Sequence, residues 1–177
     1  MLQVKVIATD VENLTDARYF AAMGVDAVCF DLGAISPEVF YAIKDWIEGV
    51  RVYVKGTAEE SDADATIVQA ASDFVAERSI IVESSYEDIK DAQLPSGQII
   101  NEHRHWDKHE PYLQEEIIAF AFDHQHYLHI PWTKELLSHT LDQDKLFGIV
   151  VSGGVEEKIG YKSFLELDEL FDIIEEE

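Results

Sequence analysis

Strand and helix signals alternate from one end of this chain to the other, and no other feature restricts its possible folds as strongly. Short runs of apolar and β-branched residues predict seven strands, at Gln3–Ala8, Ala27–Asp31, Arg51–Lys55, Ser79–Glu83, Gln98–Glu102, Tyr127–Pro131 and Phe147–Ser152. Segments with helical spacing of apolar residues separate most of these strands. Because strands that alternate with helices form parallel βαβ units, we expect an α/β protein with a mostly parallel sheet.

Helix start and stop residues support this reading. Ser36 and Pro37 provide an N-cap and a first helical residue, and Gly24 and Gly49 provide stops. The first helix begins after Asn13 or Thr15 and ends at Met23. The other predicted helices are Ser36–Glu48, Asp62–Val75, Tyr86–Ala92, Lys134–Leu141 and Ser163–Ile174.

The segment Glu116–Asp123 is ambiguous between a buried strand and the end of a helix. As a strand it would be joined to the strand at Tyr127 by three residues, and parallel neighbours need a crossover of about a dozen. Leu113, Ile117 and Phe120 share one helical face, which favours a helix over Pro111–Gln125. Seven strands remain, with eight as the alternative. A barrel of eight strand–helix units has about 250 residues, so seven units fit a single domain over residues 1–177 better.

Composition excludes several classes of function. The formal net charge of −23 opposes binding to nucleic acid or to an anionic membrane surface. We find no apolar run near the roughly 20 residues of a membrane-spanning helix. Cys29 is the sole cysteine and lies in an apolar run, so we expect a buried thiol, no disulfide framework and a cytoplasmic location.

Two sequence stretches resemble phosphoribosylanthranilate isomerases. They are Asn13–Ala17 with Ala21–Val28 and Phe30, and Gly148–Glu156 with Gly160 and Lys162. The resemblance covers roughly the first 55 and the last 50 residues. It implies a compact, shortened (β/α) barrel of the TIM type with its site at the carboxyl ends of the strands. It also implies an Amadori rearrangement in tryptophan biosynthesis, with a Cys base, an Asp acid and a phosphate on glycine-rich turns.

Most of the residues that this chemistry needs differ here. The family's catalytic Cys falls on Thr9, its following Gly on Asp10, and its substrate-contacting Arg on Glu38. The phosphate turn Ala-Gly-Gly falls near Ile130-Pro131-Trp132. The acid Asp would be Asp123 only if Ile117–Phe122 were a strand. The turn Ser152-Gly153-Gly154 is retained. We therefore predict a divergent barrel without the family's isomerase activity, which binds a small phosphorylated or carboxylated metabolite at that turn and needs no cofactor.

Polar residues at predicted strand ends provide the alternative site. They are Thr9, Asp10, Asp31, Lys55, Glu83, Glu102, His103, Trp132 and Ser152. Among these, Asp10 or Glu83 would act as a general base, and Lys55 as its electrostatic partner. An active isomerase with such replaced residues, Asp10 standing in for the Cys beside Thr9, is the first alternative function.

The histidine pairs His103-Arg104-His105 and His124-Gln125-His126 provide the second alternative. In an extended segment, His103 and His105 would point to one side, as a metal-dependent lyase or hydrolase needs. The helical reading of Pro111–Gln125 puts the two pairs at opposite ends of the barrel, which argues against one shared site. A barrel short of one unit would also leave an open sheet edge, and we expect a homodimer to cover it.

Overall fold

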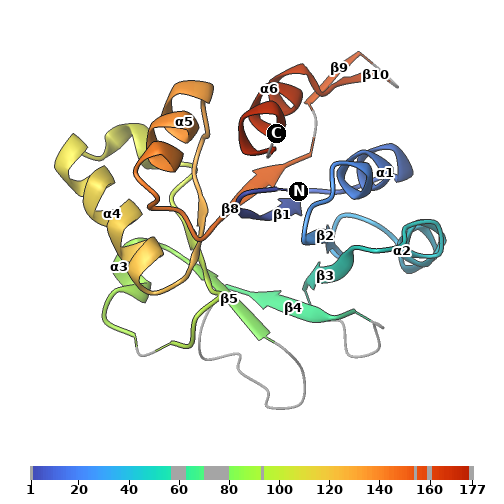
Figure 1. The fold of residues 1–177 in the computed structure, drawn as a ribbon. Helices are drawn as coiled ribbons and strands as arrows, with labels where there is room; N and C mark the ends of the chain where they lie inside the picture. Colours follow the sequence, from blue (N-terminus) through green and yellow to red (C-terminus); the bar gives the residue numbers. More distant parts are fainter. Residues whose placement is uncertain are drawn as a thin grey trace.

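Eight parallel strands form a closed barrel in the computed structural model, which describes residues 2–56, 63–69, 80–92, 94–153, 155–158 and 161–175 (Figure 1). The strands pair in chain order, and the first pairs with the eighth. They are β1 Lys5–Thr9, β2 Ala27–Asp31, β3 Arg51–Lys55, β4 Ala65–Val68, β5 Ile80–Ser84, β6 Ile99–Asn101, β7 Tyr127–His129 and β8 Gly148–Ser152. A separate antiparallel hairpin, β9 Val155–Lys158 and β10 Tyr161–Ser163, follows β8.

Helices lie outside the barrel wall (Figure 1). They are α1 Leu14–Ala22, α2 Pro37–Lys44, α3 Tyr86–Ile89, α4 Pro111–Asp123, α5 Lys134–Asp142 and α6 Leu165–Ile174, with a 3₁₀ turn at Trp106–Lys108. Asn13 and Ser36 accept hydrogen bonds from backbone N–H groups in the first turns of α1 and α2, as the sequence predicts. Within the described residues, no helix is long and apolar enough to cross a membrane.

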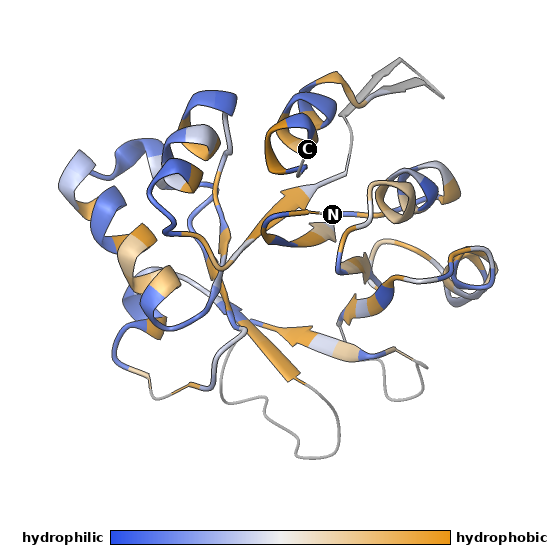
Figure 2. Ribbon diagram, in the orientation of Figure 1, coloured by the Kyte–Doolittle hydropathy of each residue, from blue (hydrophilic) through white to orange (hydrophobic). Residues whose placement is uncertain are grey.

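The core has one layer inside the barrel and another between strands and helices. Ile7, Cys29 and Tyr53 belong to the inner layer, whereas their neighbours Val6 and Val28 pack with Phe20, Phe40 and Phe171 in the outer layer. Successive residues of a strand point to opposite faces, and here both faces are buried. The strands are accordingly apolar over most of their length (Figure 2).

The residues just before β2, β4 and β6 each accept a hydrogen bond from a backbone N–H of the preceding strand. Asp26 Oδ2 accepts from Val6 N at 2.8 Å, Asp64 Oδ2 from Val52 N at 2.7 Å, and Gln98 Oε1 from Val82 N at 2.6 Å. Each acceptor is the residue immediately before its own strand. These contacts satisfy backbone donors at the amino-terminal end of the barrel, opposite the end at which the sequence predicts a site.

The strand count is eight rather than the preferred seven, because the helix predicted at Asp62–Val75 is wrong over its first half. Residues 65–68 form β4, which pairs with β3 and β5 in parallel. Residues 62 and 70–75 lie outside the described residues. The preferred helix at Pro111–Gln125 is confirmed as α4. A closed barrel of the described strands has no open edge, so the argument for a homodimer from such an edge no longer applies.

Candidate functional site

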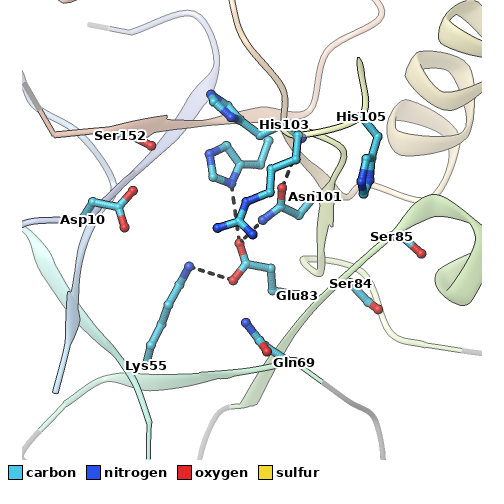
Figure 3. A pocket seen from close by; sticks show the side chains of 12 residues that line it. Asp10, Lys55, Gln69, Glu83, Ser84, Ser85, Asn101, His103, His105 and Ser152 are labelled. Atoms are coloured by element: carbon cyan, nitrogen blue, oxygen red, sulfur yellow. Dashed lines mark hydrogen bonds and ion pairs between the residues drawn. The ribbon is translucent and has the colours of Figure 1, made fainter. Parts of the chain in front are cut away.

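A cavity of about 520 Å³ lies at the carboxyl ends of the barrel strands (Figure 3). Its lining is polar and comes from seven strands or the residues just after them: Asp10, Lys55, Gln69, Glu83, Ser84, Ser85, Asn101, His103, Arg104, His105, His129 and Ser152. Six residues predicted from the sequence therefore line one cavity: Asp10, Lys55, Glu83, His103, His105 and Ser152. Lys55 and Arg104 balance Asp10 and Glu83 in formal charge, in a chain whose net charge is −23.

Glu83 is the centre of a polar network on the cavity floor. Its carboxylate is buried, with a side chain 3% exposed. Lys55 Nζ lies 2.7 Å from Oε2, and Asn101 Nδ2 donates to Oε1 at 2.9 Å. His129 Nδ1 lies 3.5 Å from Oε1, at the outer limit of a hydrogen bond. β3, β5, β6 and β7 each contribute one of these four residues.

The network fixes the charge of its members. Burial would raise the pKa of Glu83, but the contact with His129 and the charge of Lys55 outweigh that effect and lower the pKa to about 2. Burial would lower the pKa of Lys55, and the carboxylate of Glu83 reverses this, so that the pKa of Lys55 is raised. Glu83 is therefore an anion at neutral pH, and its low pKa favours an electrostatic role over that of a general base.

Asp10 and Gly153 meet at the junction of β1 and β8. Asp10 adopts a left-handed backbone conformation with φ of 56°, which costs energy in a residue with a side chain. Its Oδ2 accepts a hydrogen bond from Thr9 Oγ1 at 3.2 Å, and Thr9 Oγ1 also lies 3.5 Å from Ser152 Oγ. A Cβ on Gly153 would approach the backbone oxygen of Asp10 to 2.7 Å, so this turn requires glycine. Gly154 lies outside the described residues.

The histidines separate into two groups, as the helical reading of α4 predicts. His103 and His105 follow β6 and line the cavity, whereas His126 precedes β7 and accepts a hydrogen bond from Gln98 N at the other end of the barrel. The side chains of His103 and His105 point in different directions in Figure 3. Across the residues that the structure describes, no group of three His, Cys, Asp or Glu side chains could hold a metal ion.

Four other predicted strand-end residues and Cys29 do not line the cavity, and one of the four is the buried Thr9. Cys29 is fully buried, and burial raises the pKa of its thiol to about 12. Glu102 is buried and accepts from Tyr86 N at 2.7 Å, while its Oε2 contacts His109 Nε2 at 2.9 Å. Asp31 accepts from Gly33 N, and Trp132 Nε1 donates to Leu128 O. These are local structural contacts of strand ends.

His129, Asn101, Arg104 and Gln69 line the cavity and were missed by the sequence analysis. β7 was predicted to run to Pro131 and in fact ends at His129. His129 was therefore counted as a residue inside a strand rather than as its last residue. A histidine that interrupts an apolar strand two residues before a proline was the available signal, since proline cannot donate to a central ladder.

The fold is that of phosphoribosylanthranilate isomerases. The enzyme from Thermus thermophilus matches with a TM-score of 0.70 at 18% identity over 96% of this chain and 98% of its own. TrpF from Jonesia denitrificans matches with a TM-score of 0.72 at 12% identity, over 97% and 96%. A third structure, an isomerase in complex with reduced 1-(o-carboxyphenylamino)-1-deoxyribulose 5-phosphate, matches with 0.67 at 21%, over 97% and 98%. No family model matches the sequence, and no curated protein matches it either.

Proposed function

We propose that this chain is a cytoplasmic protein that binds a small phosphorylated or carboxylated metabolite in the cavity at the carboxyl ends of its strands, and that it lacks phosphoribosylanthranilate isomerase activity. The observation that carries the proposal is the composition of the cavity. Two cations, three histidines and several hydroxyl and amide groups line it. Such groups recognise carboxylates and phosphates. One structural neighbour is described in complex with a ligand that carries both.

The lack of isomerase activity follows from the positions of potential bases. Thr9 takes the place at which the resemblance puts a thiol, and its hydroxyl, which donates to the carboxylate of Asp10, is far less acidic than a thiol and is not a base near neutral pH. Cys29 is sealed inside the barrel, and burial raises the pKa of its thiol to about 12. Asp123, which would be the family's acid only at the end of a strand, is instead the last residue of helix α4. Phosphate is proposed to bind near Ser152 and Gly153.

An active isomerase with replaced residues is the second candidate, and one observation favours it. Asp10 holds a carboxylate in the cavity next to the position of the missing thiol, in a left-handed backbone conformation. Strained residues of this kind concentrate at functional sites. In this alternative Asp10 is the general base and Lys55 stabilises negative charge that develops on the substrate.

Two measurements test these proposals. The first is thermal unfolding with the reduced deoxyribulose phosphate that the structural neighbour binds. At ten times its Kd, a ligand stabilises the native state by about 1.4 kcal/mol, which raises Tm by about 3–6 °C for a domain of this size. Ser152→Trp fills the cavity and should remove the shift. Ser96→Trp, an exposed serine before β6 at the opposite end of the barrel, should keep it. Equal shifts in both variants would refute the cavity assignment.

The second measurement follows the fluorescence of freshly generated phosphoribosylanthranilate at high protein concentration. We expect no turnover. Turnover that Asp10→Asn abolishes would overturn the proposed loss of activity and establish the isomerase alternative.

A homodimer is also proposed, now on the basis of exposed apolar side chains instead of an open edge. Trp46, Tyr41 and Val39 lie on or just after α2 and are 64%, 41% and 43% exposed. Size-exclusion chromatography with light scattering at micromolar concentration tests this. A monomer would remove the proposal.

A further inference from the structure

His129 is the residue of the cavity whose hydrogen bonding is least satisfied. The residue is 7% exposed, and neither of its ring nitrogens has a hydrogen-bond partner within the described part of the chain. Among the described residues, the ionised group in contact with a ring nitrogen is Glu83, whose Oε1 is 3.5 Å from Nδ1. A buried polar atom without a partner costs about 1–3 kcal/mol, so its presence at a cavity wall needs a compensating role.

We propose that His129 binds the anionic oxygen of the ligand through Nε2 and takes up a proton as the ligand binds. This inference rests on the proposed function and names the group that recognises the acidic part of the metabolite. The ligand group that His129 would recognise is an oxygen that carries negative charge, which phosphates and carboxylates share.

The number of N–H donors on the His129 ring shows why binding requires a proton. Glu83 is an anion, because its contacts lower its pKa to about 2, and it can only accept a hydrogen bond from Nδ1. A ligand oxygen at Nε2 also accepts. A neutral imidazole has one N–H and one lone pair, and only the protonated ring has two donors. Simultaneous contact with Glu83 and with an anion therefore requires the imidazolium.

The charged groups around His129 support a coupled event of this kind. They are two anions, Glu83 from β5 and Asp10 from β1, and two cations, Lys55 from β3 and Arg104 after β6. Lys55 is engaged by Glu83 at 2.7 Å. An anion in the cavity would offset the remaining positive charge, so that proton and anion each favour the binding of the other.

The ring of His103 lies against this imidazole. The two ring centroids are 5.1 Å apart and the planes are inclined by 48°. His103 is exposed and belongs to the turn after β6, so a rotation of its side chain would uncover His129. Burial and the proximity of His129 lower the pKa of His103. A lowered pKa weighs against His103 as the primary anion-binding group.

The test uses sulfate, which carries two negative charges and does not titrate between pH 5.5 and 8. The histidine Cε1–H signals of the wild-type protein are titrated by NMR with and without sulfate, and His129→Gln identifies the His129 signal. We expect sulfate to raise the His129 midpoint by about one pH unit, and sulfate affinity to fall about tenfold for each pH unit above the midpoint of the free protein. Calorimetry in two buffers of different ionisation enthalpy counts the proton directly.

Variants separate His129 from the other histidines. His129→Gln should make sulfate binding weaker and independent of pH. His139→Gln, the same substitution at an exposed position on α5, should leave both the affinity and its pH dependence unchanged. Sulfate binding that leaves the His129 midpoint unmoved and releases or takes up no proton would overturn this inference and leave the proposed function standing. If neither sulfate nor the deoxyribulose phosphate binds at pH 6, the proposed function itself fails.

Discussion

The Lys55–Glu83 pair gives the sharpest test of the site as a structural unit. Replacement of Glu83 by Gln keeps the size of the side chain and removes its charge. The amide oxygen can still accept from Asn101, but the amide nitrogen then faces the ammonium of Lys55, and two donors oppose each other. Lys55 is 22% exposed, so it is only partly rehydrated after the loss of its partner.

Two estimates of the stability lost in Glu83→Gln agree. The pKa of Glu83 is lowered from 4.5 to about 2, which corresponds to about 3 kcal/mol of preference for the ionised form in the folded state. Loss of a charge-assisted hydrogen bond, with a partner left short of contacts, costs about 2–4 kcal/mol. We therefore expect Glu83→Gln to lower the free energy of unfolding by about 3 kcal/mol at pH 7.

Urea unfolding at pH 7 measures this loss, and a double-mutant cycle assigns it to the pair. Lys55→Met with Glu83→Gln removes both charges, so the double variant should be more stable than the sum of the single effects predicts, by at least about 1 kcal/mol. A loss below about 1 kcal/mol in Glu83→Gln, or strictly additive effects, would refute the reasoning that the network holds the cavity floor together.

Three further predictions concern the rest of the barrel. Burial lowers the pKa of His126 to about 4, so the unfolded chain takes up a proton at a higher pH than the folded protein does, and stability is lost as pH falls from about 6.5 to 4. In urea unfolding, the stability advantage of wild type over His126→Asn should shrink by about 2 kcal/mol between pH 7 and pH 5. An unchanged difference would contradict this. Gly153→Ala should cost about 1–3 kcal/mol in thermal unfolding, because Cβ would lie 2.7 Å from Asp10 O; an unaltered Tm would show that the turn relaxes freely. Cys29 is fully buried and should react with a thiol reagent only at the rate of unfolding, whereas immediate labelling of folded protein would show an open barrel.

Local sequence signals predicted those elements whose formation depends on neighbouring residues. Pro111 and the apolar face of Ile117 and Phe120 fixed α4, and the length that a parallel crossover needs excluded the alternative. β4 was missed because its four residues lie between polar and alanine-rich segments that resemble a helix. Its strand conformation depends on pairing with β3 and β5, and such non-local contacts leave no periodic pattern in so short a segment.

The candidate site was predictable in its location and not in its connections. Asp10, Lys55, Glu83 and Ser152 were chosen as residues at strand ends, and they line one cavity. The roles assigned to them remain predictions. That Glu83 meets Lys55 across β4 depends on how the strands are staggered around the barrel, which a single sequence does not reveal. The predicted end of β7 at Pro131 lies two residues beyond the observed end, and for that reason His129 was not recognised as a strand-end residue.

Closure of the wall between the first and last barrel strands has a consequence for the order of folding. β1 pairs with β8 over five residues, from Lys5 with Gly148 to Thr9 with Ser152. During synthesis the partner of β1 leaves the ribosome last, so nascent chains expose an unpaired parallel edge until β8 arrives. Edges of this kind recruit other chains. We therefore expect slow, late closure, and chains that stop before β8 should aggregate rather than persist as soluble open barrels.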